Sequence, residues 1–305
     1  MTMSVSDLLL EQVTRLHASD QTSRREDFDS ALWTKIEELG LPLAMCPEPD
    51  GGFALRWSDL FDVITHSAAC GEPTPLGETL IANALLCGGG AEPAASAVFF
   101  SAWAADVPET ARLLVTRGEA PALVTFSDPA GAVAGNTPTT VSTVRYAGAL
   151  LRSIQIAGAL QGALDLSVRY AQERVQFGRP LAKFQAIQHM LAQLANEAVA
   201  TAAAARIACA KMDAGDGDLA IAIAKLRAGR AVEKGAMLAH QIHGAIGVTM
   251  EYPLGRLTRN MWRWAEEFGD QREWAIAIGR TAVATGDAWD AVIAASDPVE
   301  VAGDE

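Results

Sequence analysis

The residues best suited to binding chemistry lie around one predicted turn, between residues 170 and 188. Arg174 and Gln176 precede this turn, and Gln185 follows it. A guanidinium carries a fork of N–H donors that can bind a pyrophosphate through two oxygens. Phe177, at the turn itself, can lie flat against a neighbouring group. Taken alone, these residues would be interpreted as solvated helix charges beside a core phenylalanine. Only the surrounding sequence can distinguish a binding site from that alternative.

Apolar residues at helical spacing place this turn between two helices. They recur from Leu150 to Val175, which predicts a helix over residues 148–176. Gly178 supplies a flexible residue after that helix, and Pro180 prevents its continuation. A second helix is predicted over 183–213. Such a corner exposes the polar side chains on both sides of the turn.

Two motifs in this region resemble signatures of the acyl-CoA dehydrogenases. The first is Tyr170-Ala-Gln-Glu-Arg-Val-Gln-Phe-Gly-Arg-Pro180, followed by Phe184-Gln-Ala-Ile-Gln188. The second is Gln241-Ile-His-Gly-Ala-Ile-Gly247. The resemblance covers about residues 147–291 and, more faintly, about residues 25–85. Two long motifs in the family's order are a specific signal.

The resemblance implies FAD as the cofactor. The arginine that matches Arg174 reaches an FAD bound chiefly by a neighbouring subunit, and the glutamine that matches Gln185 helps to hold it. Gln176 and Phe177 match positions along the same dinucleotide. The segment matching the backbone beside the ADP half consists of Gln241, Ile242, His243, Gly244 and Ala245. Ala245 stands where the family commonly has a second glycine, and its methyl group would crowd a close backbone approach.

The whole chain is expected to be mostly α, with an acyl-CoA dehydrogenase-like organisation. Residues 1–87 are predicted to form an N-terminal helical domain, 88–146 a shortened β middle domain, 147–293 a C-terminal four-helix-bundle domain, and 294–305 an acidic tail. Further helices are predicted at 5–17, 25–39, 57–70, 76–86, 217–243, 253–266 and 270–291. Short strands are predicted at 97–100, 111–116, 122–126 and 139–144.

The middle segment departs from the family. There it is a full β-barrel-like domain that houses the flavin ring, opened by a Thr-Glu-Pro-x-x-Gly-Ser-Asp loop. That loop is absent from this sequence, and the segment is too short for the complete domain. The sequence therefore predicts a shrunken middle domain.

The catalytic base is a second departure. Acyl-CoA dehydrogenation needs a carboxylate within reach of the α-proton, on the face opposite the flavin. The family's two glutamate positions fall on Phe268-Gly269 and near Gly148-Ala149, where this chain has no carboxylate. Glu266 and Glu267 lie one or two residues out of register and are weak candidates. They are interpreted instead as solvated acids beside a Trp262 and Trp264 core cluster, so no catalytic residue is predicted.

These departures predict a division of labour between subunits. The chain looks like the shortened subunit of the α2β2 heteromeric acyl-CoA dehydrogenases that act on steroid side chains in bacteria. A full-length sister subunit would supply the flavin ring site and the base, with an acyl-CoA as substrate and an electron-transfer flavoprotein as the expected acceptor. Two alternatives stay open: a self-sufficient homo-oligomeric dehydrogenase that uses Glu266 or Glu267, and a non-catalytic structural helical protein.

Composition excludes several other classes. The net charge of −13 without a basic stripe argues against nucleic acid and anionic membranes as partners. The four cysteines show no Cys-x-x-Cys pair and fit reduced thiols in a cytoplasmic protein. No basic leader with an apolar core and no membrane-spanning run is expected. His240 and His243 share a helix face but lack further ligands, so no metal site is predicted.

Overall fold

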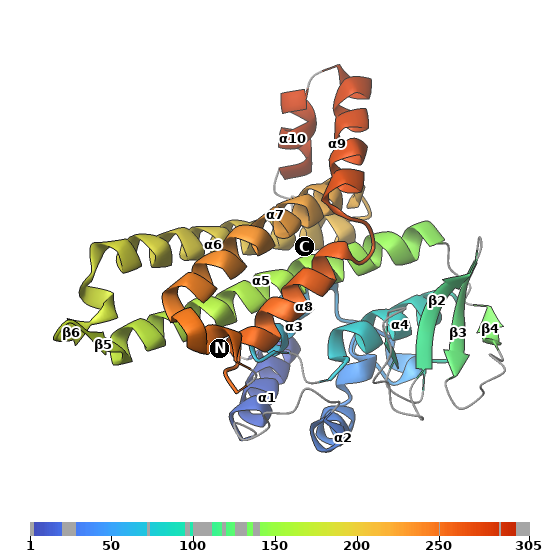
Figure 1. Cartoon of the computed structure of the whole chain (residues 1–305). Coiled ribbons are helices and arrows are strands. Elements are labelled where there is room, and N and C mark those ends of the chain that lie inside the picture. The colour runs from blue at the N-terminus through green and yellow to red at the C-terminus, as the bar shows by residue number, and fades with distance from the viewer. Residues whose placement is uncertain are drawn as a thin grey trace. The chain divides into compact units, whose positions relative to one another are not determined.

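The structure is a computed structural model of the whole chain, and helices dominate its fold (Figure 1). The structure describes residues 3–19, 29–71, 74–94, 98–99, 112–117, 120–125, 133–136, 141–249, 251–286 and 288–296. Two compact units are formed, Met1–Leu151 and Arg152–Glu305, and their boundary falls inside a long helix. The predicted mostly α fold class is confirmed. The predicted domain boundaries stay a prediction.

The first unit contains the helices α1 (Val5–Ser19), α2 (Ser30–Glu38), α3 (Trp57–Ala69) and α4 (Leu76–Gly88). The Asp29 carboxylate caps α2 by accepting the Leu32 N–H at 2.9 Å. Gly40, in the left-handed region at φ 69°, follows α2 and confirms the predicted stop. These helices match the predictions within a few residues, although residues 25–28 of the second predicted helix lie outside the described part.

A small sheet follows in the same unit, with strands β1 (Val98–Phe99), β2 (Arg112–Arg117), β3 (Ala120–Thr125) and β4 (Val133–Asn136) in that order. β1 is parallel to β2, and the other two pairings are antiparallel. Strands predicted at 111–116 and 122–126 are present. Of the predicted strand at 97–100, residues 98–99 are confirmed; residues 97 and 100, like 111 and 126, lie outside the described residues.

The strand predicted at 139–144 is wrong where the structure describes it, because helix α5 (Val141–Glu173) begins at Val141. Residues 139 and 140 lie outside the described residues. Val144, Ala147, Leu151 and Ile154 are all buried at helical spacing, so the apolar face of the helix extends further back than predicted. Burial on a helix face outweighs the weak strand preference of a few β-branched residues.

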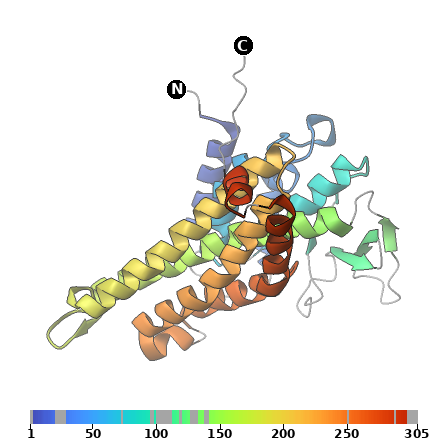
Figure 2. The ribbon, with the colours of Figure 1, turned by 90° about the horizontal axis from the view of Figure 1, so that it is seen from above.

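The second unit is a helical bundle built from α6 (Gln185–Asp213), α7 (Asp218–His243), α8 (Leu254–Glu266) and the remainder of α5. Figure 2, like Figure 1, shows α5, α6 and α7 running side by side. Gly235 permits this close packing: a Cβ there would lie 2.3 Å from Leu160 Cδ2 on α5 and 3.6 Å from Leu194 Cδ1 on α6. The predicted bundle is thus present.

The helix predicted over 270–291 is two helices, α9 (Gln271–Thr285) and α10 (Ala288–Ser296). Gly286 has φ 75°, and a left-handed glycine ends α9 before the chain reverses. Residues 294–296 of the predicted tail belong to α10, and residues 297–305 lie outside the described residues. Among the described helices, none combines the length and hydropathy that a membrane-spanning segment needs.

Candidate functional site

A two-residue β-hairpin connects α5 to α6. Its strands are β5 (Val175–Gln176) and β6 (Arg179–Pro180), so α5 ends earlier than predicted, at Glu173. Phe177 and Gly178 form the turn with φ 52° and 80°, the left-handed pair typical of a type I′ turn. The Phe177 side chain is 93% exposed, which excludes the alternative that it is a core residue.

Polar side chains of the first signature point to solvent around this hairpin. Arg174, Gln176 and Gln185 are all exposed. With its amide oxygen turned toward Arg174, Gln176 accepts a hydrogen bond from Nη2 at 2.8 Å. Arg179 lies over the Phe184 ring, with its guanidinium carbon 4.1 Å from the ring centroid.

The hairpin region is locally basic in an acidic protein. Arg174, Arg179 and Lys183 are exposed there, and Glu173 is the one acidic side chain between residues 170 and 188. Sequence reasoning assigned no role to Arg179, although it lies inside the first motif, or to Lys183, which lies just before Phe184. The signal available was that both cations closely follow the predicted turn.

The second signature ends α7. Gln241, Gly244 and Ala245 are exposed, whereas Ile242 and His243 are buried. Gly244 has φ 63° and ψ −143°, a conformation that is essentially restricted to glycine. Of the five residues predicted here, three therefore present their surface to solvent and two anchor the segment to the bundle.

A three-ring cluster joins the two signatures. The Tyr170 ring stacks on His243 with centroids 4.7 Å apart, and Tyr252 Oη lies 3.1 Å from His243 Nε2. His243 Nδ1 donates to the Ala239 carbonyl at 2.8 Å, which leaves Nε2 as the acceptor. Burial lowers the pKa of His243 and raises that of Tyr252, so the neutral pair persists at neutral pH. The cluster fixes the end of α7 beside the last turns of α5.

Both nitrogens of His243 are thus occupied, and His240 Nε2 lies 3.1 Å from Thr258 Oγ1. Among the described residues, no group of three metal-binding side chains contains either histidine.

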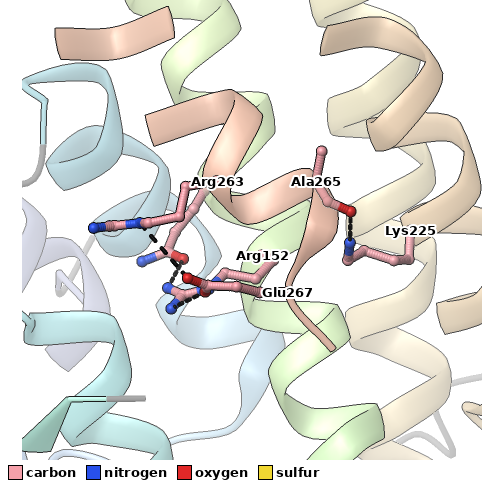
Figure 3. A network of polar contacts seen from close by, with 6 residues as sticks. Arg152, Lys225, Arg263, Ala265 and Glu267 are labelled. Carbon is pink, nitrogen blue, oxygen red and sulfur yellow. Dashed lines mark hydrogen bonds and ion pairs between the residues drawn. The ribbon is translucent and has the colours of Figure 1, made fainter. Parts of the chain in front are cut away.

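A buried ion pair lies at the turn after α8 (Figure 3). Arg152, with a fully buried side chain, donates from Nε to Glu267 Oε2 at 2.6 Å, and its Nη2 lies 2.5 Å from the same oxygen. Its Nη1 donates to Gln155 Oε1 at 2.6 Å. Arg263 Nε lies 3.6 Å from Glu267 Oε1. Glu267 is therefore not a solvated acid, and that interpretation is corrected by the burial of its partner.

Lys225 holds the same turn from the other side. Its buried ammonium donates to the Ala265 carbonyl at 2.6 Å (Figure 3). It also donates to the Gly269 carbonyl at 3.1 Å. Burial, and then the charge of Arg152, lowers the pKa of Lys225 from 10.5 to about 8. Both cations leave a signal in the sequence, because each interrupts a helix that is otherwise apolar on that face.

The residues around this ion pair divide between core and surface. Trp264 is buried and Trp262 is 48% exposed, so the predicted core cluster contains only the first of them. Glu266 is exposed. Phe268, in the Phe268-Gly269 pair that was predicted to fall on the family's glutamate position, has φ 59°, and its ring centroid lies 5.8 Å from the Arg152 guanidinium carbon.

Solved structures define the class of protein. The ChsE4–ChsE5 complex from Mycobacterium tuberculosis superposes with a TM-score of 0.74 at 18% identity, covering 93% of this chain and 98% of that chain. The Tcur3481–Tcur3483 steroid ACAD variant has a TM-score of 0.72 at 21% identity, and the match covers 92% of this chain and 96% of that chain. PigA with FAD and proline gives 0.75 at 16% identity, covering 94% and 100%. These similarities establish the acyl-CoA dehydrogenase fold.

Sequence comparison establishes the family. Residues 144–266 match the family described as acyl-CoA dehydrogenase, C-terminal domain. The acyl-CoA dehydrogenase IpdE2 of Mycobacterium tuberculosis is 30% identical over 258 residues, covering 74% of this chain and 79% of that protein. IpdE2 of Mycolicibacterium smegmatis is 29% identical over 300 residues, covering 88% and 95%. The chain belongs to the acyl-CoA dehydrogenase family, a family of flavoproteins, and that prediction is confirmed.

Other relatives match over much less of their length. Glutaryl-CoA dehydrogenase of Desulfococcus multivorans is 43% identical over 105 residues, which are 34% of this chain and 27% of that protein. The chain thus aligns with about a quarter of this relative, and with nearly all of IpdE2. The family match at residues 144–266 falls on the helical part that carries both signatures.

Proposed function

We propose that this chain is a subunit of a FAD-dependent acyl-CoA dehydrogenase, and that it completes the flavin site of a full-length sister subunit in an α2β2 heterotetramer. One observation carries the proposal. The side chains that match the family's flavin contacts, Arg174, Gln176, Phe177 and Gln185, project from the hairpin and the first turn of α6 into solvent. Contacts directed outward suit a cofactor held largely by another subunit.

The residues present fit FAD in their chemistry. Arg174 offers a guanidinium for the pyrophosphate, with Arg179 and Lys183 adding positive charge nearby. Phe177 offers an exposed aromatic face. At Gly244 no described atom lies within 4 Å of the space that a Cβ would fill, so a ligand can approach the backbone closely. When bound, FAD supplies the hydride acceptor for α,β-dehydrogenation of an acyl-CoA thioester.

Glu267 is a poor base in this setting. Accepting a proton would neutralise the carboxylate and leave the buried charge of Arg152 unpaired, at a cost of about 3–5 kcal/mol. Phe268 occupies the family's own position for the glutamate and carries no proton acceptor. The sister subunit therefore supplies the base, and the Arg152–Glu267 pair fixes the turn after α8.

The acyl group is proposed to be a steroid side chain carried as its CoA thioester. The support is similarity to a structure named as a steroid ACAD, together with the reduced β segment, which leaves room for a bulky ring system. The complex would act in a cytoplasmic β-oxidation sequence of steroid degradation and pass electrons to an electron-transfer flavoprotein. These assignments rest on the family and on the subunit role.

Two other functions remain open. A self-sufficient homo-oligomeric dehydrogenase would use Glu266 or Glu267 as its base, and a structural protein would bind neither FAD nor CoA. The single variants Glu266→Gln and Glu267→Gln test the first of these functions. The base is the glutamate whose replacement abolishes turnover while the protein stays folded. Wild-type turnover in both variants excludes it.

Arg174→Ala in the purified complex tests the flavin contact. We expect the FAD dissociation constant to rise at least about tenfold, because a charge-assisted hydrogen bond is worth about 1.5–3 kcal/mol. Arg174→Lys should recover part of this loss, since it keeps the charge and loses the fork. Arg230→Ala, an exposed arginine on α7, is the matched control. Unchanged flavin retention in Arg174→Ala would favour the structural protein.

A further inference from the structure

Three potential metal ligands from two helices converge in the first unit, and none of them belongs to either signature. His17 lies in the last turns of α1, His66 lies in α3, and Cys70 caps the end of α3. One ligand atom of each lies within 4.8 Å of the other two. We propose that His17, His66 and Cys70 form a binding site for a borderline-soft divalent cation of the Zn²⁺ class, which fastens α1 to α3.

The geometry of the pair on α3 fits this cation. His66 and Cys70 are four residues apart and share one helix face. His66 Nε2 lies 3.7 Å from Cys70 Sγ. Tetrahedral Zn²⁺, with Zn–N of about 2.0–2.1 Å and Zn–S of about 2.3 Å, holds a nitrogen and a sulfur about 3.6 Å apart. The two donors thus stand at the separation that a shared ion requires.

His17 supplies the third ligand from α1. Its Nδ1 lies 3.0 Å from the Val13 carbonyl, which can only accept, so Nδ1 carries the proton and Nε2 carries the lone pair. A backbone carbonyl on the other nitrogen is the usual way in which a metal-binding histidine is oriented. The His17 and His66 rings meet edge to face with centroids 5.4 Å apart. Closing the cluster on an ion requires side-chain displacements of at most about 1.5 Å.

The donor set selects the cation. Two imidazoles and one thiolate favour Zn²⁺ over Mg²⁺ and Ca²⁺, which take oxygen ligands. Binding deprotonates Cys70 and releases one proton to solvent. Three protein ligands leave one tetrahedral position for water. All three side chains are half-buried, so the ion can enter from solvent. The ion would then link the first helix of the chain to a helix that contributes many core residues.

Metal titration of the full-length chain tests the site. Co²⁺ should bind with one equivalent and give a thiolate-to-cobalt charge-transfer band that disappears when Zn²⁺ is added. His66→Ala and Cys70→Ala should weaken Zn²⁺ binding by about 100-fold, the upper end of the 10–100-fold loss that follows even from removing a ligand's orienting partner. The matched controls are His189→Ala and Cys87→Ala, which should keep the wild-type affinity.

Two further measurements separate loss of the site from loss of the fold. Cys70→His should keep Zn²⁺ binding and lose the charge-transfer band, because an imidazole replaces the thiolate. Zn²⁺ at 100 times its dissociation constant should raise the folding equilibrium constant of the wild type about 100-fold, and leave that of folded Cys70→Ala unchanged. Wild-type protein without the band, or equal affinity in His66→Ala, overturns the proposal. The site lies in residues 1–151 and the flavin contacts lie beyond residue 152, so either can fail alone.

Discussion

Glu267→Gln should destabilise the protein by about 3 kcal/mol. Arg152 has a fully buried side chain, and Glu267 provides the opposite charge through contacts of 2.6 and 2.5 Å. Removing one partner of a buried pair costs about 3–5 kcal/mol, because the remaining charge stays out of water without compensation. Gln155 and the aromatic rings of Trp264 and Phe268 still contact Arg152, which places the estimate at the lower end.

Urea unfolding at pH 7 is the assay, with the free energy of unfolding extrapolated to water. A loss of about 3 kcal/mol should lower the urea midpoint by about 1 M or more. Glu266→Gln is the matched control, since this neighbouring glutamate is exposed, and it should change stability by no more than about 0.5 kcal/mol.

The double variant Arg152→Met, Glu267→Leu completes the test. An apolar pair of similar volume should recover most of the lost stability, because no charge remains buried. In the assembled complex it should also recover turnover, which a catalytic Glu267 could not. A loss below about 1 kcal/mol in Glu267→Gln would refute the structural role of the pair. An inactive but fully folded double variant would contradict the conclusion that Glu267 is not the base.

Three other predictions follow from particular contacts. The pKa of Lys225 is about 8 in the folded chain and 10.5 in the unfolded chain, so the unfolded chain binds more protons between these two pH values. The free energy of unfolding of the wild type, relative to that of Lys225→Met, should therefore rise by about 3 kcal/mol from pH 8 to pH 10.5. Urea unfolding at a series of pH values measures it. Gly235→Ala should lower the free energy of unfolding by about 1–3 kcal/mol, because the added Cβ would overlap Leu160. Gly279→Ala should raise it by up to about 1 kcal/mol, because this helix position is exposed and no described atom lies within 4 Å of the added Cβ. Thermal unfolding measures both variants, and equal effects would contradict the packing role of Gly235. Phe177→Asn should stabilise the chain slightly, because Asn-Gly suits a type I′ turn, but it should weaken flavin retention in the complex. If stability and flavin retention instead rise together or fall together, Phe177 is not a surface contact to the flavin.

Helix positions were predictable from the sequence because apolar spacing sets them directly. α1, α3 and α4, and the helices of the bundle, lie within a few residues of the pattern. The exceptions have local causes: Gly286 divides the last predicted helix, and buried Val144 continues the α5 face into a run with strand preference.

The site was predictable only where contacts are local in sequence. The exposed turn at Phe177 followed from Gly178 and Pro180, although its exact hairpin form did not. The Arg152–Glu267 pair joins residues separated by 115 positions, and no spacing rule connects them. A charge in an apolar helix predicts that a partner exists, and the tertiary fold is needed to identify it. The same holds for His17 and the pair on α3.

The flavin content and native mass of the purified chain test the account most directly, measured first alone and then after co-expression with a full-length acyl-CoA dehydrogenase. If the labour is divided between subunits, the chain alone retains no stoichiometric FAD. Co-expression should give a yellow α2β2 complex with fewer than one FAD per chain. A homo-oligomer of this chain alone with one FAD per subunit would contradict the division of labour. Glu266 would then be the candidate base.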